Sequence, residues 1–388
     1  MKRVGILTWF HWNNYGTVLQ AYALNWYLNQ AGYLTETVKV IPDYSKEDLT
    51  ITLWMKKRVR DLLLHRCEVQ SESNNNAENK AESDKARKFL AFREENIVFS
   101  ELISEYDYQS DLNQYDAIVL GSDQIWHPGF YKRMYFGAKI SKEKLIAYAP
   151  SMGSIQDIEK FEQKKTMIRL IRRIPYVAVR EKKVADYLRN RYGIEAEYVV
   201  DPTFLLTREQ WSAVSDKSGE KSKSVRKPYL CLYLLGQYER EEKIKYAYQL
   251  AETMKLELLI LPVFDEDFER KFLCTVPAEC GPAEFLDIIK NAAMVLTDSF
   301  HGMVFCGIFG TRFLALERHR ETDNCQQNER IYNLLELYGA KNCLCRLKIE
   351  EDLTVASQID YKRLYVNVQG EIKRSKQYLL RALKRDEV

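Results

Sequence analysis

The sequence predicts an α/β protein of two halves, each a parallel sheet covered by helices, that face each other across a cleft. Short apolar runs with strand character alternate with longer segments whose apolar residues recur at helical spacing. Many of the apolar runs end in a polar or glycine-containing turn, as strands do at the ligand-binding edge of a doubly wound sheet. With 388 residues and 46% hydrophobic content, each half can build its own core.

The first half opens with a strand, a loop, a helix and a second strand. Val4–Thr8 is a short apolar run, and the polar loop His11–Gly16 leads into a helix at Thr17–Ala31, which Gly32 ends. The next strand is predicted at Thr35–Ile41. The opening loop lacks the G-x-G-x-x-G spacing, so the sequence does not predict a dinucleotide site there.

Further strands and helices complete this half. The predicted strands are Tyr115–Leu120, Leu145–Ala149, Tyr176–Val179 and Tyr198–Val200, and the predicted helices are Leu53–Leu64, which is basic and amphipathic, Phe89–Glu95 and Lys183–Arg191. Residues 68–86 are rich in Ser, Asn, Glu and Lys and contain no large apolar anchor, which predicts a mobile loop.

A charged stretch nearly free of apolar residues, 216–228, predicts a linker between a first domain at 1–215 and a second at 229–360. The second half repeats the alternation, with strands predicted at Tyr229–Leu235, Glu257–Leu261, Met294–Thr297 and Arg312–Leu316, and helices at Arg240–Met254, Pro282–Asn291 and Arg330–Tyr338. A basic helix is predicted at 361–388, with Gly370 as a point of interruption.

Composition argues against several classes of function. The net charge is only +3, without the strong basic excess typical of a nucleic-acid-binding protein. No apolar run reaches the ~18 residues that span a membrane, and the N-terminus lacks the apolar core of a signal peptide. The eight cysteines form no paired C-x-x-C framework, and Cys343 and Cys345 have no further ligand at metal-binding spacing. We therefore expect a cytoplasmic protein without a bound metal.

The stretch Met294–Gly310 has the strongest functional pattern. An apolar strand ends in Thr297, Asp298 and Ser299, and a small, apolar helix follows His301 and Gly302. Asp298 or Ser299 is expected to cap that helix. The unpaired N–H groups of a helix start favour an anion, and a histidine in such a turn can donate to it or act as an acid.

Several pieces of the chain together resemble the polysaccharide pyruvyl transferase family. The matching pieces are Gly5–Thr8 with Asn13–Ala21, Tyr115–Asp116 through Gly121–Trp126, Val179–Glu181, Val200–Thr203 and Thr297–Gly302. They follow the family order and cover nearly the whole chain. The resemblance implies two Rossmann-like domains in a GT-B-like arrangement, with the acceptor on the first domain and the donor on the second.

The resemblance also implies a reaction. Phosphoenolpyruvate would be the co-substrate, no cofactor would be needed, and the product would be a pyruvate ketal on a sugar of a cell-surface glycan precursor. The family's donor-binding histidine maps to His301 and a donor-binding arginine to Arg180. Better-studied members carry an arginine where this chain has Ser299, so Arg318, Arg320 and Arg330 are candidates for the missing charge.

Each remaining candidate has a functional and a structural interpretation. Asp298 is either a base or a helix cap, and Asp123 either a base or part of a turn. Trp126 either stacks on a sugar or packs inside the protein. Asp201, Pro202 and Thr203 are interpreted mainly as residues that shape a turn, with a chemical role as the alternative. The full set predicts catalytic residues His301, Asp298 and Asp123; donor-binding residues Arg180, Ser299, His301, Gly302, Arg318 and Arg330; and acceptor-binding residues Asn14, Tyr15, Gly16, Ser122, Gln124 and Trp126.

Two rival functions remain open from the sequence. One is a GT-B-like glycosyltransferase that uses a nucleotide sugar, and the other is a non-catalytic glycan-binding relative that keeps the cleft. The basic C-terminal segment adds an expectation about partners, because it can contact an anionic membrane that carries a lipid-linked oligosaccharide acceptor. Its alternative is a packed helix with a solvated basic face.

Overall fold

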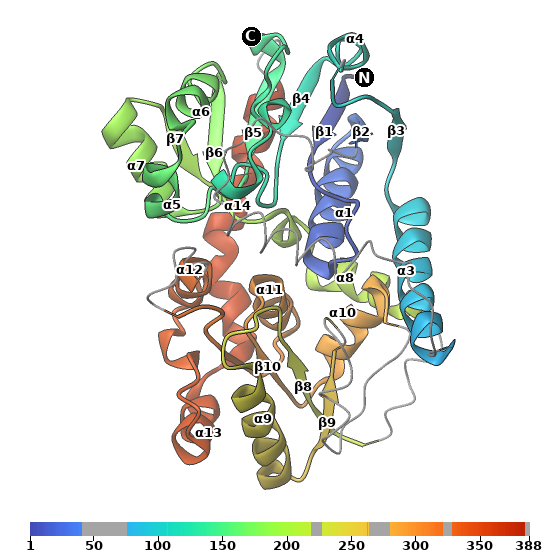
Figure 1. Ribbon diagram of the computed structural model, residues 1–388, viewed down its shortest axis with the longest axis vertical. Coiled ribbons are helices and arrows are strands. Elements are labelled where there is room, and N and C mark those ends of the chain that lie inside the picture. The colour runs from blue at the N-terminus through green and yellow to red at the C-terminus, as the bar shows by residue number, and fades with distance from the viewer. Residues whose placement is uncertain are drawn as a thin grey trace.

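Two parallel sheets, each covered by helices, form the two domains of the protein. The structure is a computed structural model that describes residues 1–40, 76–106, 108–218, 227–261, 263, 280–320 and 328–384; for 76–83 it describes the backbone only. Figure 1 shows the domains stacked along the long axis, with the first above the second. The α/β class and the two-domain, GT-B-like architecture predicted from the sequence are confirmed.

The first domain contains a seven-stranded sheet in the order β3-β2-β1-β4-β5-β6-β7, with every neighbouring pair parallel. Its strands are β1 (Arg3–Leu7), β2 (Leu34–Lys39), β3 (Phe99–Leu102), β4 (Ala117–Leu120), β5 (Leu145–Tyr148), β6 (Tyr176–Val179) and β7 (Ala196–Tyr198). Its helices are α1 (Tyr15–Gln30), α3 (Asn76–Asn96), α4 (Gln109–Leu112), α5 (Ile155–Lys160), α6 (Lys164–Ile171), α7 (Lys182–Tyr192) and α8 (Arg208–Ser215).

The second domain contains a four-stranded parallel sheet in the order β11-β10-β8-β9. The strands are β8 (Tyr229–Tyr233), β9 (Glu257–Ile260), β10 (Met294–Thr297) and β11 (Phe313–Ala315). The helices are α9 (Arg240–Met254), α10 (Pro282–Asn291), α11 (Phe300–Phe309), α12 (Asn328–Tyr338) and α13 (Ile349–Gln358).

The last helix, α14 (Tyr361–Lys384), joins the two domains. Near its start, the Tyr361 hydroxyl donates to the Phe313 carbonyl of the second domain. Farther along, the Ser375 hydroxyl accepts from the Val200 amide and the Tyr378 hydroxyl donates to the Ala147 carbonyl, both in the first domain. Gly370 lies inside the helix without interrupting it. The predicted basic helix is therefore amphipathic, and its buried face fastens one domain to the other.

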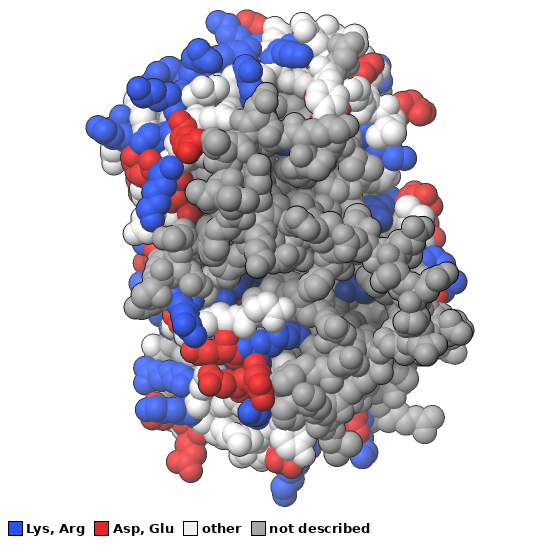
Figure 2. All heavy atoms as spheres, viewed as in Figure 1, with Lys and Arg blue, Asp and Glu red and all other residues white. Residues whose placement is uncertain are grey.

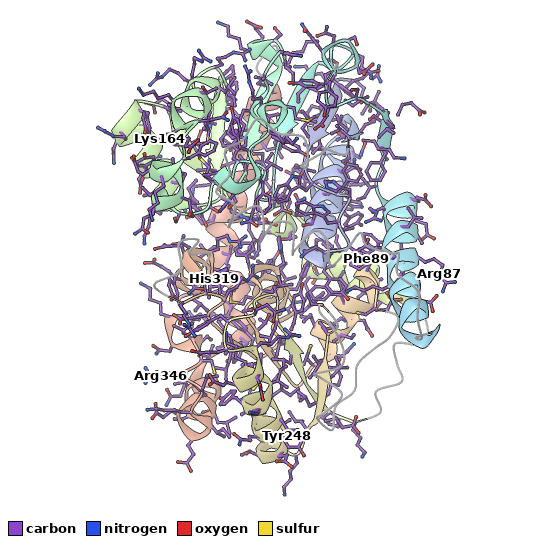
Figure 3. The ribbon with its side chains drawn as sticks, viewed as in Figure 1. Arg87, Phe89, Lys164, Tyr248, His319 and Arg346 are labelled. Atoms are coloured by element: carbon purple, nitrogen blue, oxygen red, sulfur yellow. The ribbon has the colours of Figure 1, made fainter. Side chains whose placement is uncertain are left out.

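Aromatic side chains pack across the domain boundary beside α1. The Tyr15 ring stacks on Phe285 of α10 with centroids 4.5 Å apart, and its hydroxyl donates to the Cys280 carbonyl. The ring centroid of Phe89 in α3, labelled in Figure 3, lies 5.1 Å from that of Tyr15. These contacts hold the start of α1 close to the second domain.

The segment predicted to be a mobile loop differs from the prediction. Helix α3 begins at Asn76 and includes residues 76–86, while residues 68–75 and the predicted helix Leu53–Leu64 lie outside the described residues. Ala, Glu and Lys favour a helix even where apolar residues are few. Phe89 and Phe92, farther along α3, are buried and attach it to the body of the protein.

Most other predicted elements agree with the structure within a few residues. The elements that were not predicted are β3, α4, α5, α6, α8 and α13. The strand predicted at Tyr198–Val200 is β7, which ends at Tyr198, so Val200 already belongs to the turn. Among the described residues, none of the helices has the length and apolar character needed to cross a membrane.

Candidate functional site

A pocket between the domains collects residues from the strand ends of one domain and the helix starts of the other. Arg180 and Glu181 follow β6, Asp201 follows β7, and all three line the pocket with Phe300 of α11 and Arg330 of α12. Because parallel strands end at one edge, residues far apart in sequence meet there. The carboxyl ends of the first sheet thus form one wall and α11 and α12 form the other.

Arg180, Asp201 and His301 form the centre of this site. Arg180 Nη1 donates to Asp201 Oδ2 over 2.6 Å, and the Arg180 guanidinium lies 4.8 Å from the centre of the Phe300 ring. His301 Nε2 lies 3.5 Å from the same Asp201 oxygen, which makes this contact electrostatic rather than a well-formed hydrogen bond. One carboxylate therefore joins a cation of the first domain to the histidine of the second.

Asp201 is held ionised although it is fully buried. Its other oxygen, Oδ1, accepts from the amide and the hydroxyl of Thr203 at 3.0 and 2.7 Å. Burial raises the pKa of a carboxyl, but His301, Arg180 and the Thr203 amide outweigh it and hold the pKa of Asp201 well below its ordinary value. Asp201 was predicted mainly to shape its turn. The structure shows that it does so with one oxygen and binds site residues with the other.

Gly16 is the point at which α1 meets His301. A Cβ atom at this position would lie 2.0 Å from His301 Nδ1, which is closer than any real contact. The helix start can approach the imidazole ring only because residue 16 has no side chain. His301 is therefore held between Asp201 on its Nε2 side and the Gly16 backbone on its Nδ1 side.

Three arginines lie near one another at this site: Arg180 and Arg330 line the pocket, and Arg318 is close enough for its charge to act on Arg330. Burial, together with the positive charges of Arg318 and Arg180, lowers the pKa of Arg330 to about 9. Burial also lowers the pKa of Arg180, but the negative charges of Asp201, Glu181 and Asp123 outweigh burial, so the pKa of Arg180 is raised. Mutual repulsion among these cations would be relieved by an anion bound among them. The structure thus brings together Arg180, Arg318 and Arg330, which were predicted from distant parts of the sequence.

Arg318 is positioned by a short network in the second domain. Its Nη2 donates to the Asp298 carbonyl over 2.9 Å. The Asn328 side chain accepts from the Arg318 amide and donates to the His319 carbonyl, which fixes the loop after β11. His319, labelled in Figure 3, lies close to the boundary between the domains.

Glu181 is a second buried carboxyl in the pocket, and its environment differs from that of Asp201. Its Oε1 accepts from the Ser151 hydroxyl over 2.5 Å, and its Oε2 has only a long contact, 3.4 Å, from the Met152 amide. Burial raises the pKa of Glu181, and Arg180 and Ser151 offset this only in part. Glu181 was not among the predicted site residues, although it follows Arg180 directly in the Val179–Glu181 motif.

The turn before α11 is held by its own side chains. Asp298 accepts the Leu235 and Gly236 amides with its two carboxylate oxygens, at 2.7 and 2.8 Å, so both oxygens serve the neighbouring loop. Ser299, rather than Asp298, is the helix cap, since its hydroxyl accepts from the Gly302 amide over 3.2 Å. Gly302 fits tightly against Thr297 and Tyr233. These three residues shape the turn that presents His301.

Asp123 and its neighbours form the part of the first wall after β4. Asp123 accepts from the Thr17 hydroxyl over 2.7 Å and from the Gln124 amide over 2.9 Å, and it has a left-handed φ of 63°. Ser122 is buried and donates to the Ala149 carbonyl over 2.8 Å. Asn14 caps α1 by accepting from the Thr17 amide.

Two aromatic residues predicted to bind the acceptor lie in the protein interior. The Trp126 indole is fully buried, stacks on Phe136 and donates to the Tyr135 carbonyl. Tyr15 packs against Phe285 at the domain boundary, as described above. Neither ring leaves a face open to a sugar, so these two predictions are corrected in favour of packing.

Comparison with known proteins agrees with the motifs at this pocket. The family model for polysaccharide pyruvyl transferase matches residues 14–320, which include the first wall and α11 but end before α12. The chain belongs to the polysaccharide pyruvyl transferase family. It is accordingly assigned as a transferase. A search of curated proteins found no match.

Solved structures with the same architecture have very different sequences. A putative UDP-N-acetylglucosamine 2-epimerase from Listeria monocytogenes aligns with a TM-score of 0.59 at 10% identity, covering 100% of this chain and 97% of that one. The UDP-GlcNAc 2-epimerase from Neisseria meningitidis aligns with a TM-score of 0.54 at 9% identity, covering 98% and 100%. At this identity the likeness shows the shared two-domain fold. The pyruvyl transferase family match is what distinguishes this chain among such folds.

Proposed function

We propose that this member of the polysaccharide pyruvyl transferase family transfers a pyruvyl group from phosphoenolpyruvate to a sugar of a cell-surface glycan precursor and forms a cyclic ketal. The observation that carries the proposal is a pair of arginines in the interdomain pocket, Arg180 and Arg330, with Arg318 close enough for its charge to act on Arg330. His301 faces the carboxylate that binds Arg180. Phosphoenolpyruvate carries a carboxylate and a phosphate, and guanidinium groups match both by paired hydrogen bonds.

The site supplies the charges that this reaction needs without a family arginine at position 299. Ser299 is occupied as the helix cap, while Arg318 and Arg330 come from the elements that follow β11. Arg180 keeps its Nε and Nη2 buried without a hydrogen-bond partner among the described residues, although Glu181 lies 3.8 Å from Nε. Buried donors of this kind are costly unless a ligand accepts from them. We assign that ligand as the phosphoenolpyruvate anion.

An activity assay with the full chain tests the proposal. Phosphoenolpyruvate and a panel of nucleotide-linked and lipid-linked sugars are supplied, phosphate release is followed, and the sugar product is analysed for the ketal methyl group by NMR. We expect phosphate release that depends on an acceptor, with a His301→Asn variant at least ~100-fold slower because an acid, base or donor group is lost. A ketal formed at the same rate by the variant would remove His301 from the reaction.

The same panel separates the rival functions. Consumption of a nucleotide sugar without phosphoenolpyruvate would support a GT-B-like glycosyltransferase or a related nucleotide-sugar enzyme. Retention of a glycan with no turnover under any condition would support a binding protein that keeps the cleft.

Peripheral contact with an anionic membrane stays a prediction. On α14, Lys362, Arg363 and Lys373 are exposed, whereas Arg374 and Arg381 pair with Glu371 and Glu197. Lys and Arg side chains also gather at the upper left of Figure 2, over α6 and α7.

Sedimentation with phosphatidylglycerol vesicles tests this contact, comparing the wild type with a variant in which the exposed basic residues of α14 are changed to Glu. The prediction is weaker pelleting of the variant. Equal pelleting of both proteins would rule out a role for α14 in the contact.

A further inference from the structure

We infer that Glu181 is the residue that protonates the methylene carbon of the donor. This inference rests on the proposed function, because it assigns a role within that reaction. Glu181 lines the same pocket as Arg180 and Arg330, directly beside the place proposed for the donor anions. A general acid must lie within reach of the atom that it protonates. The described residues that line this pocket include two carboxyls, Glu181 and Asp201, and of these Glu181 keeps an oxygen without a close hydrogen-bond donor.

The other buried carboxyls near the pocket are already occupied. Asp201 uses Oδ1 for Thr203 and Oδ2 for Arg180, and Asp298 uses both oxygens for backbone amides. Asp123 accepts from Thr17 and Gln124. Glu181 engages Oε1 firmly with Ser151, but its Oε2 has only the 3.4 Å contact from Met152. Oε2 is therefore the Glu181 oxygen that is available to carry the proton.

The pKa values of the two pocket carboxyls, Glu181 and Asp201, are also shifted in opposite directions. Burial raises the pKa of Glu181, which favours its neutral acid form, whereas His301 and Arg180 overcome burial and lower the pKa of Asp201, which keeps that carboxylate charged. Environments that separate two carboxyls in this way assign one to proton donation and the other to electrostatic support. Asp201 holds Arg180 and faces His301, and Glu181 holds the proton.

The proton balance of the reaction closes with this assignment. The Glu181 proton forms the new C–H bond at the methylene carbon, and the positive charge develops at the neighbouring carbon. One sugar hydroxyl oxygen bonds to that carbon, the phosphate leaves with its bridging oxygen, and the second hydroxyl closes the ketal. Of the two hydroxyl protons, one restores the Glu181 acid and the other leaves on the phosphate, so the donor and the sugar are the only reactants.

A Glu181→Gln variant separates proton donation from binding, because the amide keeps the shape and cannot supply the proton. Phosphoenolpyruvate binding is measured by calorimetry and turnover by phosphate release. We expect kcat to fall at least ~100-fold while the Kd for phosphoenolpyruvate changes less than ~10-fold. Glu329→Gln, the same change at a partly exposed residue that pairs with Lys183, is the matched control and should leave both values unchanged.

Each outcome decides a different question. If the wild type fails to bind phosphoenolpyruvate, the proposed function itself is wrong. If Glu181→Gln binds it and turns over at the wild-type rate, the function stands and the assignment of Glu181 is overturned. A loss of binding as large as the loss of turnover would make Glu181 a positioning residue for Arg180. Should the Gln variant not fold, Glu181→Asp replaces it, with lower kcat expected and an unchanged kcat contradicting the inference.

Discussion

At the scale of single residues, the site depends on a glycine, Gly16, and on the carboxylate of Asp201, which contacts two other site residues. Gly16 lets α1 approach His301, and Asp201 connects His301 with Arg180. The sequence motifs identified Gly16, Arg180 and His301 individually. The function of Asp201 could not be predicted in the same way, because its partners lie 21 and 100 positions away and only the fold brings them together.

Gly16→Ala is expected to damage both stability and activity. The added methyl group would lie 2.0 Å from His301 Nδ1, so the ring or the helix must move. We expect a loss of about 1–3 kcal/mol in unfolding free energy, as for other overpacked sites, and a lower kcat from the displaced histidine. Gly370→Ala in α14 is the control, since a Cβ there meets nothing within 4 Å and should stabilise the helix slightly. Equal effects of the two substitutions would contradict this account of Gly16.

At the scale of elements, the sequence predicted strand-turn-helix units. It did not predict which side chains beside the turns are buried, or where the helix α3 begins. The apolar run of β10, the polar turn with Asp298 or Ser299 as the expected cap, and the small, apolar run after Gly302 predicted that unit. Trp126 and Tyr15 were assigned to the acceptor because an aromatic residue beside a polar turn has the same pattern whether it is exposed or buried. Helix α3 was placed partly in a mobile loop because its N-terminal half contains almost no apolar residues.

Ser299→Ala tests whether the cap of α11 supports His301. Loss of the hydroxyl leaves the Gly302 amide without its acceptor and should cost about 1 kcal/mol, measured by thermal unfolding. Because His301 lies in the first turn of α11, phosphoenolpyruvate binding should weaken as well. Ser154→Ala removes the equivalent cap of α5, a helix that does not carry His301, and should lower stability without changing binding. Weakened binding in both variants, or in neither, would argue against a specific role for the α11 cap.

At the scale of the whole molecule, α14, α10 and the Arg180–Asp201–His301 group hold the two domains around one pocket. The sequence predicted two α/β domains and a cleft, because the alternation of elements and the charged stretch at 216–228 are local signals. It could not predict that the last helix returns to the first domain, since that path depends on contacts such as Tyr378 with Ala147.

Acid sensitivity should reveal the buried Asp201. Its pKa is lower in the folded protein than the ~3.9 of an unfolded chain, so its stabilising effect is complete above about pH 4 and is lost as the pH falls below that value. Asp201→Asn should therefore lower the unfolding temperature strongly at pH 7, because Arg180 loses its main counter-charge, and the gap to the wild type should narrow below pH 4. Asp216→Asn, at an exposed aspartate, is the control. A gap that stays constant from pH 7 to pH 3 would contradict the assignment.

Calorimetric titration of the full chain with phosphoenolpyruvate tests the central claim most directly, because it needs no knowledge of the acceptor. We predict saturable binding to the wild type, and binding at least ~10-fold weaker to Arg180→Lys, since lysine keeps the charge but loses the paired donors. Arg172→Lys, at an exposed arginine that does not line the pocket and donates to the Tyr192 carbonyl, should bind like the wild type. Binding of UDP-N-acetylglucosamine with no binding of phosphoenolpyruvate, or equal binding by the wild type and Arg180→Lys, would contradict the account.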